Sequence, residues 1–176
     1  MERWMDHIWG RAIAAGMVAA QAMGLYIMVA MALSGLGFWS YPNIVAAAFP
    51  GFRPPTASFT PIATAIGAWS HVLVGAAIAI PYGLMTWAIA PAIDKRVPRE
   101  LITGLLYGGL VYVVMGKLIA PLVNPAMPMV PEAHWVVGHL IFGVVTALLV
   151  AASARRYEPP VTFAPEVKAE APTSRL

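Results

Sequence analysis

Residues 71–79 read HVLVGAAIA, and residues 139–147 read HLIFGVVTA. Both stretches follow the pattern His-x3-Gly-x3-Ala inside a long apolar run, so their small residues repeat about one helical turn apart. A second pair of related segments lies upstream, where residues 11–16 read RAIAAG and residues 99–104 read RELITG. The repeated order of these segments predicts a helical hairpin that is present twice in the chain.

The composition predicts an all-α integral membrane protein. The chain is 60% hydrophobic and 11% charged, whereas soluble domains contain about 25% charged residues. A helix needs roughly 20 mostly apolar residues to cross a bilayer. Four stretches meet that requirement, at residues 11–35, 62–90, 100–120 and 132–153. We therefore expect a bundle of four transmembrane helices over residues 1–154, with a kink in the second span at Pro81.

The lysine and arginine residues predict how the bundle is oriented. They gather before span one, between spans two and three, and after span four, at Arg3, Arg11, Lys95, Arg96, Arg99, Arg155, Arg156, Lys168 and Arg175. The connection 36–61 holds only Arg53, and the connection 121–131 holds none. Short loops rich in Lys and Arg stay in the cytoplasm. Both termini and the loop 91–99 are expected there, and residues 155–176 predict a disordered cytoplasmic tail.

Other features of the composition concern the compartment and the partners. The first apolar run is longer than the roughly 7–15 residues of a signal-peptide core, so we expect it to be retained as a span. Abundant Ala, Gly and Pro indicate a bacterial gene, and the expected location is the bacterial inner membrane. The net charge of +3 is scattered over helix ends, which does not favour nucleic-acid binding. The absence of cysteine excludes disulfides and thiolate metal sites.

Small residues at every fourth position predict close contacts between the helices. Such residues let transmembrane helices approach until their backbones touch. They are Gly16, Ala20 and Gly24 in span one, Gly75 and Ala79 in span two, Gly104 and Gly108 in span three, and Gly143 and Ala147 in span four. Because each unit has two spans, two copies of the hairpin would insert in the same direction.

The two histidines are the strongest candidates for a functional site, because ionisable residues inside a membrane are costly and usually functional or paired. Both lie in the half of the bundle nearer the long loops. His71 and His139 are candidates for the axial ligands of a b-type haem, with Gly75 and Gly143 one turn away to leave room for it. The alternatives are hydrogen bonds to Ser70, Thr146, Gln21 or backbone carbonyls, and a proton-relay or transport site.

Three further groups of polar or sulfur-containing side chains are candidates for specific contacts. Lys117 is expected to extend its ammonium to the headgroups, with a haem propionate or an anionic headgroup as the alternative partner. Gln21 is expected to bridge helices. The loop before span four holds Met127, Met129 and His134, which are weak candidates for a copper site because thioether and imidazole suit Cu(I).

The loop 36–61 combines six aromatic residues with five prolines. Aromatic rings favour the level of the membrane interface. We expect residues 43–49 to form a short helix there that anchors the loop, with a lid or a partner-docking surface as the alternative.

The sequence contains no nucleotide-binding glycine loop, no His-Glu-x-x-His motif and no serine elbow, so catalysis by this chain alone is not expected. The segment 104–108 and the two His-x3-Gly stretches resemble a family of small four-span bacterial membrane proteins of unknown function. That resemblance implies an inner-membrane helical bundle. The expected function is a non-catalytic accessory or assembly subunit of a larger respiratory or photosynthetic membrane complex. A bis-histidine haem b electron-transfer protein and a small-solute or metal transporter are the alternatives.

Overall fold

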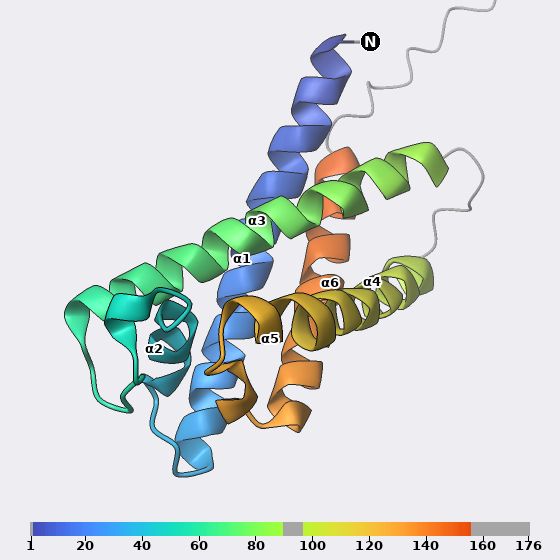
Figure 1. Ribbon diagram of the computed structural model, residues 1–176. Helices are drawn as coiled ribbons and strands as arrows, with labels where there is room; N and C mark the ends of the chain where they lie inside the picture. The colour runs from blue at the N-terminus through green and yellow to red at the C-terminus, as the bar shows by residue number, and fades with distance from the viewer. Residues whose placement is uncertain (1, 90–96, 156–176) are drawn as a thin grey trace, which may run out of the picture.

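The computed structural model describes residues 2–89 and 97–155, and the side-chain surroundings of residues 8–86 and 99–153. This part of the chain is helical and contains no strand (Figure 1). The elements are α1 (Glu2–Leu33), α2 (Ser40–Ala46), η1 (Pro50–Phe52), α3 (Pro61–Ile89), α4 (Val97–Val111), η3 (Tyr112–Ile119), α5 (Ala120–Val123), η4 (Met127–Met129) and α6 (Glu132–Arg155).

Four helical stretches are long and apolar enough to cross a membrane. They are Ile8–Leu33, Pro61–Thr86, Arg99–Val123 and Glu132–Ser153, which confirms the predicted all-α class with four apolar helices. These lengths and this composition are those of a multi-pass membrane protein. The predicted disordered tail and most of the predicted loop 91–99 lie outside the described residues.

The first span ends where glycine permits a left-handed turn. Gly35 has φ +76°, and its N–H bonds to the carbonyl of Ala32 at 3.1 Å, while the N–H of Leu36 bonds to the carbonyl of Met31 at 2.9 Å. This pair of bonds is the Schellman motif that closes many helices. It turns the chain into the loop that leads to α2.

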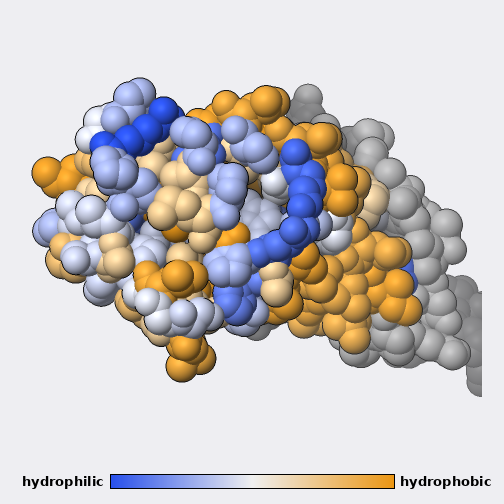
Figure 2. Space-filling view, turned by 60° about the horizontal axis from the view of Figure 1, so that its bottom comes forward, coloured by the Kyte–Doolittle hydropathy of each residue, from blue (hydrophilic) through white to orange (hydrophobic). Residues whose placement is uncertain are grey.

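The four long helices pack as two hairpins. α3 lies against α1, α4 lies against α6, and α1 and α6 lie side by side (Figure 1). The short helix α2 packs on α3. The segments 34–60 and 124–131 gather at the end of the bundle opposite the N-terminus (Figure 1), which we call the loop end. Figure 2 views this end and shows polar residues over it, with apolar surface along the flank.

Glycines form the contacts within each hairpin. A Cβ atom at Gly16 would collide with the backbone of Gly75 and the side chain of Ala79. In the second hairpin, a Cβ at Gly104 would collide with the backbone around Gly143 and the side chain of Ala147. Close backbone contact of this kind is a main source of helix association in lipid.

A second glycine in the third span serves the same hairpin. A Cβ at Gly108 would collide with the carbonyl of His139. Gly108 therefore allows α4 to reach the turn of α6 that carries this histidine.

The third span is less regular than its sequence predicts. Residues Tyr112–Ile119 form a π-helix, and the N–H of Ala120 bonds to the carbonyl of Met115, five residues back. Pro121 has no N–H for the carbonyl of Lys117, which removes one α-helical bond at this point. In addition, the indole of Trp135 lies against Gly116. Both features favour a wider turn here. In contrast, α3 continues through Pro81 without a break in the helix.

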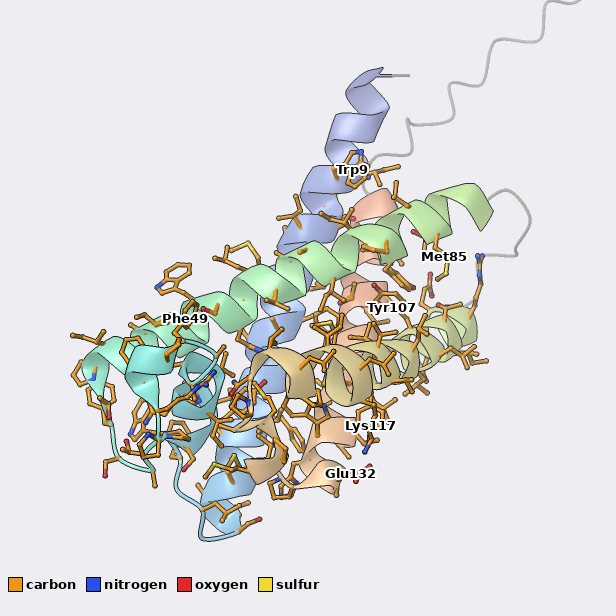
Figure 3. All side chains as sticks on the ribbon, viewed as in Figure 1. Trp9, Phe49, Met85, Tyr107, Lys117 and Glu132 are labelled. Atoms are coloured by element: carbon orange, nitrogen blue, oxygen red, sulfur yellow. The ribbon has the colours of Figure 1, made fainter. Side chains whose placement is uncertain are left out.

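α3 and α4 meet through two tyrosines. The rings of Tyr82 and Tyr107 lie 4.9 Å apart between centroids, and the hydroxyl of Tyr107 donates a hydrogen bond to the carbonyl of Ile78. Figure 3 shows Tyr107 in the region between the two helices. Towards the loop end, the region between α3 and the third span contains a cavity.

Candidate functional site: a cavity that holds both histidines

The cavity has a volume of about 250 Å³. It is lined by α1, α2, α3, the third span, α5 and α6, so every major element contributes to its wall. Most of the lining side chains are apolar, such as Met23, Ile78, Met115 and Phe142. Both His71 and His139 line it, so the structure brings the two sequence-predicted histidines to one site.

His71 is fully hydrogen bonded in its neutral form. Its Nε2 lies 2.9 Å from the carbonyl oxygen of Ala20, and a carbonyl can only accept, so Nε2 carries the proton. Its Nδ1 lies 3.2 Å from the hydroxyl of Tyr41, which therefore donates to the Nδ1 lone pair. His71 thus ties α3 to α1 and to α2.

His139 has one free nitrogen. Its Nδ1 lies 2.8 Å from the carbonyl oxygen of Trp135, one turn earlier in α6, so Nδ1 carries the proton. In the neutral ring the lone pair is then on Nε2. This atom makes no hydrogen bond with any residue in the described part of the chain, although the residue is only 4% exposed. The two histidines therefore differ: one is satisfied, and the other presents an unused acceptor.

These bonds bear directly on the haem hypothesis. A bis-histidine haem needs one free imidazole lone pair on each side of the iron. As arranged here, His139 offers one and His71 offers none. Gly75 and Gly143 do not leave open space beside the histidines. The side chain of Ala20 occupies the space beside Gly75, and the backbone of Gly104 and Gly108 occupies the space beside Gly143. The residues present do not fit a bis-histidine haem unless the bonds from His71 to Tyr41 and Ala20 break.

Aromatic rings connect the two histidines along one wall. Tyr41 lies edge-on to His71 at 5.3 Å between centroids and to Trp135 at 6.5 Å. The Trp135 ring in turn lies 5.2 Å from His139. Burial raises the pKa of the Tyr41 phenol above its usual value of 10.0, so this hydroxyl remains a donor at physiological pH.

The short helix α2 covers the loop end of the cavity. All seven of its residues are buried, so α2 packs against the bundle. The helix begins three residues earlier than the predicted residues 43–49 and ends at Ala46, while Phe49 and Phe59 of the same loop stay exposed. Asn43 fixes the chain that follows it, because its amide nitrogen donates to the carbonyls of Thr56 and Ser58, at 2.8 Å each. Gly67 on α3 leaves room for the backbone of Pro42.

Asn124 fixes the same cover from the other hairpin. It is 1% exposed, its amide nitrogen donates to the carbonyl of Ile44 at 2.7 Å, and its amide oxygen accepts from the N–H of Ala126 at 3.1 Å. A buried asparagine with both ends bonded locks α5 to α2.

Lys117 pairs with a carboxylate. Its Nζ lies 2.6 Å from Glu132 Oε1, and the hydroxyl of Tyr112 donates to the same oxygen at 2.6 Å. Figure 3 shows Lys117 and Glu132 close together near the loop end. The contact of Lys117 with lipid headgroups stays a prediction beside this ion pair. Both side chains are well exposed, so the pair adds little stability.

The remaining sequence candidates have separate surroundings. Gln21 is exposed and bonds only weakly to the carbonyl of Met17 in its own helix, at 3.4 Å, so it does not bridge helices. Of the copper candidates, Met127 lines the cavity and Met129 is 55% exposed. His134 bonds to the hydroxyl of Ser34 at 3.1 Å. No cluster of three or more His, Cys, Asp or Glu side chains suited to a metal occurs among the described residues.

Sequence reasoning missed two residues that line the cavity from the connections between the spans, Tyr41 and Asn124, and the role of Gly67 in packing α2 on α3. A buried polar residue in a loop has no periodic pattern that marks it. The asparagines in Pro-rich connections were the one available signal, since such side chains commonly bond to nearby backbone.

Comparisons with protein families, with curated proteins and with solved structures found no match. The resemblance to a family of small four-span membrane proteins therefore stays a prediction.

Proposed function

We propose that this chain is a non-catalytic integral membrane protein that serves as an accessory or assembly subunit of a larger membrane complex, such as a respiratory or photosynthetic one. We further propose that a partner helix packs on the outward face of α4. The observation that supports this proposal is the surroundings of Gly109. A Cβ at this position would meet nothing within 4 Å, whereas a Cβ at the neighbouring Gly108 would collide with the backbone of α6.

A glycine on a lipid-facing surface needs an explanation. Within a helix, glycine costs about 1 kcal/mol of stability relative to alanine, and contact with lipid does not offset that cost. Contact with a second transmembrane helix does offset it, because a small residue lets the two backbones approach and pack closely. Large aliphatic side chains surround Gly109 on the exposed face, among them Leu105, Leu106, Leu110 and Val113.

The fraction of each span that is buried within the chain also supports α4 as the surface for a partner. Within the chain, 22% of the third span's apolar stretch is buried, against 44% for the first span. The third span therefore has the most surface left for a partner.

We also infer the orientation and the origin of the bundle. The Lys and Arg distribution favours an orientation with both termini in the cytoplasm, and the abundance of Ala, Gly and Pro favours a bacterial inner membrane. The matching contacts Gly16–Gly75 and Gly104–Gly143 support a duplicated hairpin, because residues at corresponding positions of the two units meet in the same pairs.

The test is purification from native membranes in mild detergent, with the wild-type chain, a Gly109→Leu variant and an Ala14→Leu control. Ala14 is exposed on α1, so the control adds the same bulk to another outward face. We expect partner subunits at fixed stoichiometry with wild type and Ala14→Leu, and their loss with Gly109→Leu. Ala14→Leu should unfold at the wild-type temperature and Gly109→Leu at the same or a slightly higher temperature, because leucine favours the helix over glycine. Wild-type chain that purifies from native membranes as a stable, solitary monomer would overturn the proposal.

A further inference from the structure

The cavity is too large and too apolar to be explained as a site for ordered water. A water molecule occupies about 30 Å³ and needs roughly 2–4 polar partners, while the cavity measures about 250 Å³. Its polar neighbours mostly bond elsewhere. Asn124 is saturated by Ile44 and Ala126, and the His71 ring is saturated by Ala20 and Tyr41.

Among the acceptors of the cavity wall, Nε2 of the neutral His139 ring lacks a partner in the described part of the chain, and the residue is 4% exposed. Two donors in the wall also lack a partner there: the Ser70 hydroxyl, and Trp135 Nε1, which is buried against Gly116. An acceptor in such apolar surroundings gains free energy from a hydrogen bond with a ligand. The missing partner must be a donor. A carbonyl or an ether oxygen cannot supply it, but a hydroxyl can.

The cavity is open to the surface of the bundle. Three of its lining residues, Phe49, Val74 and Val123, are also exposed at the surface, at 47%, 45% and 57%. They come from the segment after α2, from α3 and from α5. Their apolar side chains favour entry of a molecule that is dissolved in lipid over one that is dissolved in water.

We infer that this cavity binds a lipid-soluble molecule that carries a hydroxyl group, with the hydroxyl donating to Nε2 of His139 and the apolar body lying between α3 and the third span. Two sources supply this chemistry in a membrane: the reduced, hydroxylated ring of a quinol, and the hydroxyl of a long-chain or polycyclic lipid alcohol. The hydrogen bond selects for the hydroxyl group of the ligand, and the apolar walls accommodate the apolar part of a quinol or of a lipid alcohol. This inference does not depend on a partner subunit.

Binding is measured by titration calorimetry on the purified chain in lipid nanodiscs. The probes are a decyl-substituted benzoquinol, the dimethyl ether of that quinol, and hexadecanol. The ether keeps the shape of the quinol but has no donor. We expect wild type to bind the quinol or the alcohol, and to prefer the quinol over its ether by about tenfold if the quinol is the ligand, as one hydrogen bond allows.

Two variants separate the hydrogen bond from the cavity. His139→Phe keeps a planar ring of similar size and removes the acceptor, so the preference for a donor should disappear while weak apolar binding remains. Val74→Trp places bulk at the opening and should abolish binding of all three probes, and because Val74 is partly exposed, this variant should fold. Circular dichroism and size-exclusion chromatography establish that both variants fold.

Each outcome decides the inference. Binding of the quinol but not of hexadecanol supports it and assigns the ligand as a quinol, and the reverse supports it with a lipid alcohol. Equal affinity for the quinol and its ether, without binding of the alcohol, overturns it. A donor preference that survives in His139→Phe, or a wild-type chain that binds none of the probes, also overturns it.

Discussion

The hydroxyl of Tyr41 donates to Nδ1 of His71 at 3.2 Å, and the opposite side of the same ring donates to the carbonyl of Ala20 at 2.9 Å. One imidazole therefore holds three elements together: α2 through Tyr41, its own helix α3, and α1 through Ala20. The ionisable residue that looked most like a cofactor ligand in sequence is thus fully used in tertiary structure.

Tyr41→Phe is expected to destabilise the folded chain by about 1–3 kcal/mol, because it leaves Nδ1 of His71 buried without a donor. The free energy of unfolding in mixed detergent and denaturant measures the loss. Tyr26→Phe is the matched control, since Tyr26 packs edge-on to His134 and its hydroxyl has no hydrogen-bond partner among the described residues. Equal stability of the two variants would contradict the role given to the bond.

The contribution of Tyr41 should also depend on pH in one direction. Burial raises the pKa of its phenol above the usual 10.0, so the folded state keeps Tyr41 neutral at a pH where the unfolded chain ionises. The stability that Tyr41 adds is then complete below about pH 10 and declines above it. The difference in unfolding free energy between wild type and Tyr41→Phe, measured from neutral to alkaline pH, should be flat and then fall. A fall that begins near neutral pH would show that a different group titrates.

Substitution by alanine should change stability in opposite directions at two neighbouring glycines of the third span. Gly108→Ala places a methyl group against the carbonyl of His139, which is backbone and cannot move aside, so we expect a loss of about 1–3 kcal/mol from overpacking. Gly109→Ala meets nothing within 4 Å and should be neutral or stabilise the isolated chain by up to about 1 kcal/mol. Thermal unfolding of both variants in detergent provides the comparison, and a similar loss for the two would contradict the helix contact described for Gly108.

The sequence predicts the helices well and the site only in part, and the reason is physical. Periodic apolar runs locate all four spans because the bilayer imposes both length and composition. The depth of His71 and His139 follows from the same count. In contrast, the partners of these histidines depend on tertiary contacts. Tyr41 comes from the short helix α2, thirty residues before His71, and the carbonyl that His71 binds has no sequence signature.

The π-helix at Tyr112–Ile119 was missed for a related reason. Its two causes lie apart in sequence, since Pro121 follows directly whereas Trp135 belongs to the next span. Only the proline is a local signal, and a proline near the end of a span more often marks the end of a helix than a change in its pitch.

A reduced-minus-oxidised absorption spectrum tests the haem alternative independently of the cavity ligand. His71 has no lone pair free for iron while its bonds to Tyr41 and Ala20 persist, so we expect no b-type α-band from wild-type protein made in haem-replete cells. The His71→Ala, His139→Ala double variant is the control, and its spectrum should match that of wild type. An α-band that is present in wild type and lost in the double variant would show the opposite: that His71 leaves Tyr41 and Ala20 to bind iron, which requires α2 to move away from α3. Tyr41→Phe would then strengthen haem binding, because it frees Nδ1 of His71, whereas a helix-packing role predicts only the loss of stability already described.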